Sequence, residues 1–378
     1  MNLTHPELAR LSREGPQSAI DFVDGQEFPK INGSSVLFAW RGAADEVHLV
    51  HWIHGLSSGT PFVRIQGSDV WLLEMELPEG SRVEYKLEIV DGRGRRLIQD
   101  PRNRFLATDP FGSNSVVHAS GYVEPDWSHF DSEARPGALV DHVLKSHALE
   151  SLRTFQLYLP ARYRPRRRYP LLVVHDGPDY VRFANFKVVL DNLIHRLEIP
   201  PLIVALIPAQ DRMREYMDDE RHGRFLVEEL IPAIEQRWST IGRPSARGLM
   251  GASLGAVASL AAAWRHPGYF GSLLLQSGSF VFADIGDHGR GPVFDPVARF
   301  VSQFRREPGL PAENVFLSCG QYESLIYFNR SLLPVLQKTG ARVRMTEARD
   351  GHNWENWRDR LREGLSFLFP GPLWFVYE

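Results

Sequence analysis

Apolar and polar residues alternate in short runs along the first third of the chain. In the runs 71–77 and 82–89, every second residue is apolar and most residues between them are charged. A period of two predicts antiparallel strands with one buried face. The residues at 78–80 join these two runs, and the Asp-Gly pair at 91–92 is suited to the next hairpin turn. Short strands with frequent turns predict a small immunoglobulin-like β-sandwich in residues 1–125.

The pattern of apolar and polar residues changes near residue 151. Short apolar runs recur there and are separated by stretches with helical periodicity. The apolar runs are 154–159, 170–174, 202–207, 247–250, 272–276, 314–318 and 341–346. The helical stretches include 354–368 and 223–238, where Pro232 is expected to introduce a kink. Strands that alternate with helices predict an α/β fold, with a largely parallel sheet covered on both faces. Residues 126–150 show neither pattern and are expected to form a linker.

Composition and charge narrow the classes of function. The chain has 378 residues, of which 43% are hydrophobic and 24% charged, and its formal net charge is −3. Neither this charge nor any motif predicts nucleic-acid binding. No apolar run approaches the ~18 residues of a membrane span, and the charged N-terminal segment lacks the apolar core of a secretory signal. We therefore expect a cytoplasmic protein without a membrane partner. The lone Cys319 excludes an intrachain disulfide framework.

The clearest chemical signal is the pentapeptide GASLG at 251–255, which contains Ser253. An apolar run precedes it, and the helix-forming sequence AVASLAAAW follows it directly. That context is typical of a nucleophile elbow, in which a sharp strand-to-helix turn exposes a serine hydroxyl. The N-terminus of the following helix favours negative charge that develops nearby. The pattern predicts a serine hydrolase.

A serine nucleophile needs a base and an acid, which α/β-hydrolases carry in the chain order Ser, acid, His. His352 lies between the last apolar run and the final helical stretch, where that base is expected. Glu323 closely follows a predicted strand, and we expect it to hold the imidazole in the useful tautomer. Asp287 and Asp295 compete for this role, although neither is attached to a visible strand end. Asp350 is too close to His352 in sequence to orient its ring comfortably.

Beyond the serine motif, several further segments stand in a distinctive order. They are VWLLEMELPEGSRVEYKLEI at 70–89, DPRN at 100–103, DG at 176–177, Asp211 with Arg214 and Glu215, FLVEELIP at 225–232 and GHNW at 351–354. Together with the serine motif they resemble the enterochelin (enterobactin) esterase family over nearly the whole chain. The resemblance implies an α/β-hydrolase domain in residues 151–378 after the sandwich. It also implies a cytoplasmic enzyme that cuts the triester backbone of a catecholate siderophore.

By this resemblance Ser253 is the nucleophile, His352 the base and Glu323 the acid of an acyl-enzyme mechanism. Neither a metal nor an organic cofactor is implied. A ferric catecholate is anionic, so cationic side chains should line its site near the carboxyl ends of the strands. The arginines expected there are Arg182, Arg212, Arg214, Arg221 and Arg224. The side chains that we expect to bind the substrate are Arg214, which lies in a family segment, Tyr180, Arg182 and Trp354.

The oxyanion hole should combine the N–H of Leu254 with a second backbone donor in the turn at 175–180. Related esterases of this fold take the second donor from the residue after the Asp-Gly pair. That residue is Pro178 here, and it has no N–H. We therefore expect Gly177 or Asp179 to supply the donor, or the side chain of Tyr180 to replace it.

Two other functions fit the same sequence. A carbohydrate esterase that removes acetyl or feruloyl groups would share the chemistry and use the sandwich as a glycan-binding module. Trp40, Trp52 and Trp71 could then form a carbohydrate platform, although core packing is the favoured interpretation. A non-catalytic siderophore- or glycan-binding protein that lost its oxyanion hole at Pro178 is the third possibility.

Overall fold

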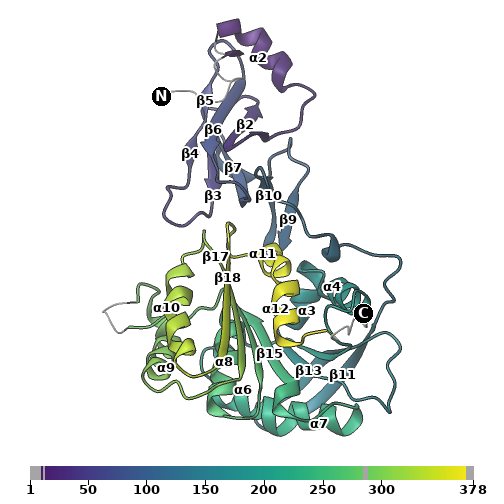
Figure 1. The fold of residues 1–378 in the computed structure, drawn as a ribbon. Coiled ribbons are helices and arrows are strands. Elements are labelled where there is room, and N and C mark those ends of the chain that lie inside the picture. Colours follow the sequence, from purple (N-terminus) through teal and green to yellow (C-terminus); the bar gives the residue numbers. More distant parts are fainter. Residues whose placement is uncertain (1–9, 12, 284–287, 372–378) are drawn as a thin grey trace. The chain divides into compact units, whose positions relative to one another are not determined.

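The computed structural model describes residues 10, 11, 13–283 and 288–371, and its chain divides into two compact units (Figure 1). Unit 1 holds the chain up to Glu124 together with two short segments from the C-terminal half, Gly320–Ser324 and Ala348–Asn353. Unit 2 begins at Pro125 and holds the rest. Each unit is described by itself below.

Unit 1 contains the predicted β-sandwich, preceded by helix α2 (Pro16–Val23). One sheet has the order β1 (Lys30–Asn32), β2 (Ser35–Arg41), β6 (Val70–Glu76) and β5 (Val63–Arg64). The other has the order β4 (Thr60–Pro61), β3 (Glu46–His51), β7 (Arg82–Asp91), β10 (Gly112–His118) and β9 (Leu106–Asp109), and β8 (Gly94–Ile98) also pairs with β7.

The alternation in β7 is the reason that this strand has one buried face. Tyr85, Leu87 and Ile89 are fully buried in the sandwich core, and the residues between them are partly exposed. The turn at 91–94 joins β7 to β8 as a hairpin, as predicted. The turn at 78–80 is not a hairpin, because β6 and β7 belong to different sheets. Alternation identified both strands, but it could not assign their partners.

A small polar cluster explains the DPRN segment. Tyr85 donates a hydrogen bond to Asp100 Oδ2 (2.7 Å), and Asn103 Nδ2 donates to the same tyrosine hydroxyl (3.0 Å) and to the carbonyl of Val116 (2.8 Å). These side chains are buried, so their mutual hydrogen bonds offset the cost of removing them from water. The segment therefore has a structural role, because its side chains form hydrogen bonds with β7 and β10 of the sandwich.

Unit 2 is built on an eight-stranded sheet. Its order is β11 (Ala138–Ser146), β12 (Ser151–Leu159), β14 (Ile203–Ile207), β13 (Leu171–His175), β15 (Arg247–Ala252), β16 (Ser272–Gln276), β17 (Asn314–Gly320) and β18 (Arg342–Ala348). The central pairs from β14 to β17 are parallel, and β12 runs antiparallel to both of its neighbours. The expected linker at 126–150 is wrong in part, because β11 lies inside it. Residues 138–146 are mostly exposed or half-buried, which left no apolar run to recognise.

Helices cover both faces of this sheet. They are α3 (Gly177–Phe183), α4 (Phe186–His195), α5 (Arg212–Tyr216), α6 (Glu220–Arg224), α7 (Ile231–Arg237), α8 (Leu254–Arg265), α9 (Asp295–Arg306), α10 (Ile326–Gln337), α11 (Trp354–Asp359) and α12 (Leu361–Leu368). Two hydrophobic cores result, one on each face: Leu171 and Val173 of β13 belong to the first, and Leu172 and Val174 to the second. The predicted parallel sheet with two buried faces is confirmed.

The helical stretch at 223–238 is less regular than its periodicity suggested. A π-helical segment, Phe225–Leu230, connects α6 to α7. Pro232 is the second residue of α7 and follows the π-helical segment directly. The irregularity therefore precedes the proline. Within the described residues, no helix has the length and apolar character required to cross a membrane.

Candidate active site

Ser253 occupies the sharp turn that the pentapeptide predicted. It lies between the end of β15 and the start of α8 with φ 57° and ψ −119°, a conformation that costs a non-glycine residue about 1–3 kcal/mol. The flanking glycines make the turn possible. A Cβ on Gly251 would lie 2.4 Å from the carbonyl carbon of Gly255, so only glycine permits this approach of strand and helix.

One backbone donor next to Ser253, the N–H of Leu254, is left without an acceptor within the described ranges. Its own N–H donates to the carbonyl of Gln276 (2.9 Å), and its Oγ lies 3.2 Å from Ser279 Oγ. Leu254 is the first residue of α8, and its N–H has no intrahelical acceptor. No acceptor for it exists among the residues that the structure describes. This N–H is therefore available to an oxyanion.

The second expected donor lies in the turn after β13. Asp176 has a left-handed conformation (φ 54°) and caps α3, which begins at Gly177. A Cβ on Gly177 would lie 2.4 Å from Leu206 Cα, so this residue also has to be glycine. The N–H of Asp179 donates to the carbonyl of Asp176 (3.0 Å) and is thus occupied within the turn. The N–H of Gly177 has no acceptor in the described part of the chain, so of the two candidates only Gly177 keeps a free donor.

Glu323 and His352, which are 29 positions apart in sequence, meet in unit 1. His352 Nδ1 lies 2.7 Å from Glu323 Oε2, and the N–H of Gly320 donates to Glu323 Oε1 (2.7 Å). The carboxylate is 1% exposed, whereas the imidazole is 37% exposed. A buried carboxylate on Nδ1 directs the other ring nitrogen, Nε2, outward as the proton acceptor. Ser253 belongs to unit 2.

The competing acids have other partners or lie elsewhere. Asp287 lies outside the described residues. Asp295 begins α9 with an exposed side chain, and its Oδ1 lies 3.1 Å from His288 Nε2. Asp350 is buried and binds Arg82. Glu323 is therefore the carboxylate that meets His352.

The sandwich anchors the loop that carries His352. Arg82 of β7 donates to Asp350 Oδ1 (3.3 Å) and to Asn353 Oδ1 (3.1 Å), and its backbone N–H donates to the carbonyl of Arg349 (2.9 Å). The same Asp350 oxygen accepts from the N–H of Gly351 (2.7 Å) and from Asn353 Nδ2 (2.8 Å). Burial raises the pKa of Asp350 to about 6, against the opposing effect of Arg82. The ion pair with Arg82 thus offsets part of the free-energy cost of burying the Asp350 carboxylate.

A second contact anchors the loop that carries Glu323. The hydroxyl of Tyr322 lies 2.6 Å from Ser81 Oγ, and the carbonyl of Tyr322 accepts from the N–H of His54 (2.8 Å). The tyrosine ring packs against the sandwich core. Arg82, Ser81 and Tyr322 were not among the predicted site residues. No pattern in the neighbouring sequence could have identified them, because each contacts a partner more than two hundred positions away in the chain.

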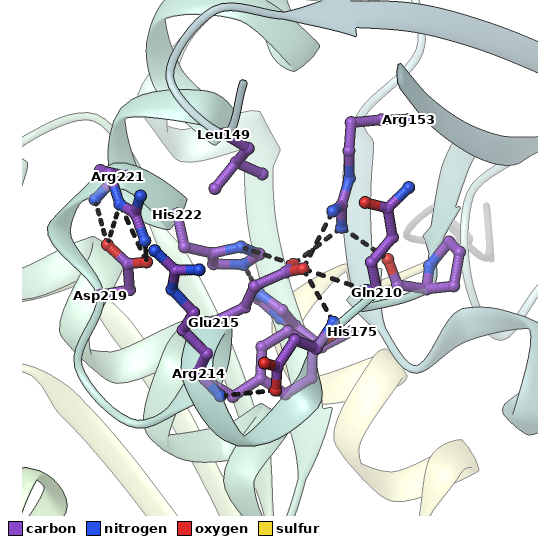
Figure 2. Close-up of polar contacts among 12 residues, drawn as sticks. Leu149, Arg153, His175, Gln210, Arg214, Glu215, Asp219, Arg221 and His222 are labelled. Carbon is purple, nitrogen blue, oxygen red and sulfur yellow. Dashed lines mark hydrogen bonds and ion pairs between the residues drawn. The ribbon is translucent and has the colours of Figure 1, made fainter. Parts of the chain in front are cut away.

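A buried polar network lies in unit 2 around Glu215 of α5 (Figure 2). Arg153 donates to both oxygens of Glu215 (2.9 and 2.7 Å), and the backbone N–H groups of Gln210 and Asp211 donate to Oε1 (3.0 and 3.2 Å). Figure 2 shows the carboxylate between Arg153 and His222, whose Nδ1 lies 3.7 Å from Oε2. Glu215, which belongs to one of the family segments, therefore has a structural role: it forms a buried ion pair with Arg153.

This network continues to the two turns described above. His222 Nε2 lies 2.9 Å from His175 Nε2, and His175 Nδ1 lies 2.9 Å from Ser259 Oγ, which donates to the carbonyl of Gly255 (2.8 Å). Burial lowers the pKa of His222 to about 3 and that of His175 well below its usual range, so both rings are neutral. Hydrogen bonds thus link the strand end before Asp176 to the first turns of α8. Sequence reasoning missed both histidines.

Two of the predicted substrate-binding residues are core residues. Tyr180 is fully buried and donates from its hydroxyl to Gln276 Oε1 (2.8 Å). Trp354 is 9% exposed and packs edge-on against Tyr180, with ring centroids 5.1 Å apart. Both predictions are wrong, because aromatic residues at the predicted sheet edge close the core there. Tyr180 is equally excluded as an oxyanion donor.

The predicted arginines divide into occupied and available groups. Arg212 Nε donates to Asp176 Oδ2 (2.9 Å) and Arg221 binds Asp219 (2.6 Å). The side chain of Arg214 is exposed, and no described residue forms an ion pair with it. Arg182 lies over the ring of Phe183 (4.9 Å from the centroid), where its charge stays accessible.

No group of three or more His, Cys, Asp and Glu side chains in the described ranges has an arrangement that would hold a metal ion. The strained serine, the carboxylate-bound imidazole and the free N–H groups of Leu254 and Gly177 are the components that acyl transfer requires.

Comparisons with known proteins agree with this chemistry. The family model described as putative esterase matches residues 146–368. The iron(III) enterobactin esterase of Escherichia coli K12 is 24% identical over 397 residues, which covers 94% of this chain and 96% of that protein. The solved enterobactin esterase of Shigella flexneri, determined in the presence of enterobactin, is 21% identical with a TM-score of 0.74 and covers 94% of this chain and 98% of its own. The resemblance to enterochelin esterases and the predicted fold are confirmed.

Two further relatives match over shorter shares of their length. The Bacillus subtilis protein YjcH is 30% identical over 148 residues, 37% of this chain and 62% of that protein, and it is uncharacterised. An endo-1,4-β-xylanase/feruloyl esterase of Xylanibacter ruminicola is 22% identical over 91% of this chain and 46% of its own length.

Proposed function

The chain belongs to the putative esterase family and is a carboxylic ester hydrolase; from that premise we propose that it is a serine esterase that cleaves a catecholate siderophore of the enterobactin type. The observation that carries the serine mechanism is Ser253 in its strained turn beside the available N–H of Leu254. The substrate class rests on the enterobactin esterases that match nearly the whole chain. A reducing cytoplasmic site of action is part of the same proposal.

In the proposed first step, Ser253 Oγ attacks an ester carbonyl while His352 Nε2 accepts the serine proton. Glu323, already bound to Nδ1, stabilises the imidazolium that forms. The N–H groups of Leu254 and Gly177 donate hydrogen bonds to the oxyanion. Removal of one such donor typically lowers kcat by about 10²–10³-fold. The tetrahedral intermediate collapses, the imidazolium gives its proton to the leaving alkoxide, and a serine acyl ester remains.

The second step repeats the chemistry with water. His352 Nε2 removes a proton from water, the hydroxide attacks the acyl carbonyl, and the proton passes to Ser253 Oγ as it leaves. The carboxylic acid product and the free enzyme result. Every proton is carried by His352, so the reaction needs no other acid or base.

The charge of the substrate gives the exposed arginines a role. A ferric tricatecholate is anionic, and Arg214 and Arg182 keep their guanidinium groups accessible in unit 2. Guanidinium groups pair well with anionic oxygens, and at a partly exposed site each such contact contributes modestly. We assign these two residues to substrate binding in place of Tyr180 and Trp354.

The test is hydrolysis of ferric and iron-free enterobactin followed by chromatography and mass spectrometry. We expect the wild-type protein to release dihydroxybenzoylserine units and Ser253→Ala to release none above background. Cleavage by both proteins would refute the role of Ser253. No cleavage by either would refute the siderophore assignment.

A feruloyl esterase is the second candidate, favoured by the match to the Xylanibacter ruminicola enzyme. Of the three tryptophans considered as a carbohydrate platform, Trp71 is buried and Trp40 packs against the sandwich core, whereas Trp52 is 54% exposed. A single exposed tryptophan does not make a platform. Release of ferulate from feruloylated arabinoxylan, at a rate above that on enterobactin, would favour this candidate.

A further inference from the structure

A cavity of about 690 Å³ lies within unit 1, and its walls come from the sandwich and from the two segments that carry Glu323 and His352. The volume is in the range of pockets that bind small organic molecules. Of the catalytic pair, Glu323 is almost fully buried and His352 is the group open to solvent. The cavity therefore provides room beside the catalytic imidazole.

The sandwich contributes exposed apolar side chains to this cavity. Trp52 follows β3 and is 54% exposed, Leu56 is 56% exposed, and Phe111, in the turn between β9 and β10, is 95% exposed. None of the three belongs to a hydrophobic core formed by the residues that the structure describes. Large aromatic side chains exposed at a cavity are typical of sites that stack on a flat ligand.

The cavity also contains a cation that is available to a ligand. Lys86 lies on β7 with its side chain on the face of the sheet opposite the core, and none of the described residues forms an ion pair with it. The nearby acid on the same strand, Glu84, is already held by Arg82 (3.3 Å) and by Asn114 Nδ2 (2.7 Å). Lys86 is therefore available to pair with a bound anion, and repulsion by Glu84 is reduced because Arg82 already neutralises part of its charge.

From these observations we propose that this cavity binds a catecholate ring of the ester substrate, stacked on Trp52 with its anionic oxygens near Lys86. This inference rests on the proposed function, since it places the substrate's aryl group beside the base that acts on its ester bond. It makes the sandwich part of the substrate site. The structure thereby gives the N-terminal domain a role in substrate selection in addition to its anchoring of the catalytic loops.

Direct binding tests the proposal without relying on catalysis. The probe is 2,3-dihydroxybenzoylserine, which has one catechol ring and no ester, titrated by calorimetry into wild-type protein, Trp52→Ala and Lys86→Met. Stacking of a ring on an aromatic side chain contributes about 1–3 kcal/mol in comparable sites, so Trp52→Ala should weaken Kd by roughly tenfold. Lys86→Met keeps the aliphatic chain, and we expect a roughly threefold loss that shrinks as salt rises.

Matched controls come from exposed residues outside the cavity. Phe130 is 83% exposed and Lys145 lies on the exposed side of β11, so Phe130→Ala and Lys145→Met should bind the probe as the wild type does. Equal affinity in wild type, Trp52→Ala and Lys86→Met would overturn the proposal. An equal loss in a control variant would overturn it as well, because the effect would then not belong to the cavity.

Kinetics separate this proposal from the proposed function. In Trp52→Ala, kcat/KM for the catecholate ester should fall about tenfold relative to kcat/KM for methyl butyrate, which has no ring. If the ratio stays constant while both esters are cleaved, the esterase assignment survives and the cavity assignment fails. If no ester is cleaved but the probe binds as expected, the cavity assignment survives and the esterase assignment fails.

Discussion

The serine turn and the acid–base pair are both small, strained or buried arrangements, yet they are specified in opposite ways. The turn at Ser253 is built by its neighbours in sequence: Gly251 and Gly255 permit the close approach, and α8 begins at once. The pair of Glu323 and His352 is held by residues far away in the chain. Arg82 and Asp350 are 268 positions apart, and Ser81 and Tyr322 are 241 apart.

This difference has a physical consequence. The turn depends mainly on the backbone sterics of its own glycines. The acid–base loops depend on a few buried polar contacts, and a buried charge that loses its partner is strongly destabilising. The position of the His352 imidazole should therefore be sensitive to substitutions in the β-sandwich, whereas the turn at Ser253 should be affected little by them.

The largest effect is expected at the serine itself. Ser253→Ala removes the nucleophile and should lower kcat for ester hydrolysis by roughly 10⁴-fold or more. The fold should persist, since alanine is small and the strained backbone is held by both glycines. Chromatography of the hydrolysis products measures the loss, and far-ultraviolet circular dichroism checks the fold. Retention of wild-type hydrolysis would remove Ser253 from the mechanism.

The next effect tests the long-range anchor. Arg82→Met leaves Asp350 buried without its arginine and should lower the free energy of unfolding by about 3 kcal/mol. The loosened His352 loop should also lower kcat/KM by roughly 10–100-fold. Urea denaturation and steady-state kinetics measure the two effects. Arg41→Met, which removes a surface ion pair with Asp24 and Asp69, is the matched control and should leave both quantities near wild type.

A smaller effect concerns the buried histidines of unit 2. His222 has a pKa of about 3 in the folded protein, against about 6.5 when unfolded, so the unfolded chain binds more protons between these values. Stability is therefore complete above pH 6.5 and is lost as pH falls, by about 2 kcal/mol between pH 6.5 and 5. Urea unfolding at several pH values should show this slope. His222→Gln cannot titrate and should reduce this slope, while His175, whose pKa is also lowered by burial, accounts for what remains. An unchanged slope would contradict the assignment.

The smallest effect concerns the oxyanion turn. Pro178→Ala supplies an N–H at the position that related esterases use. Because the available donor is Gly177, we expect kcat to change by less than about threefold. A rise of about 10²–10³, the usual value of one oxyanion donor, would show that the proline had cost the enzyme its second donor.

The same difference between local and long-range contacts explains which parts of the fold and of the site could be predicted from the sequence. The period-two pattern of β7 and the seven apolar runs predicted the sandwich and the parallel sheet, because burial of one or two faces leaves a direct record in sequence. β11 left none, since an edge strand with a mixed exterior has no apolar run. Tyr180 and Trp354 illustrate the opposite error: both were expected to bind the substrate, but the sequence could not show that they pack against each other in the core.

The central claim is that Ser253 is activated by the imidazole that Glu323 orients, and covalent labelling tests it most directly. Wild-type protein, Ser253→Ala and His352→Ala are treated with a fluorophosphonate, and the adduct is located by mass spectrometry of proteolytic peptides. We expect rapid labelling of the wild type at Ser253, none of Ser253→Ala at that peptide, and labelling of His352→Ala slowed by roughly 10³-fold or more. Equal labelling rates in the wild type and His352→Ala would contradict the account.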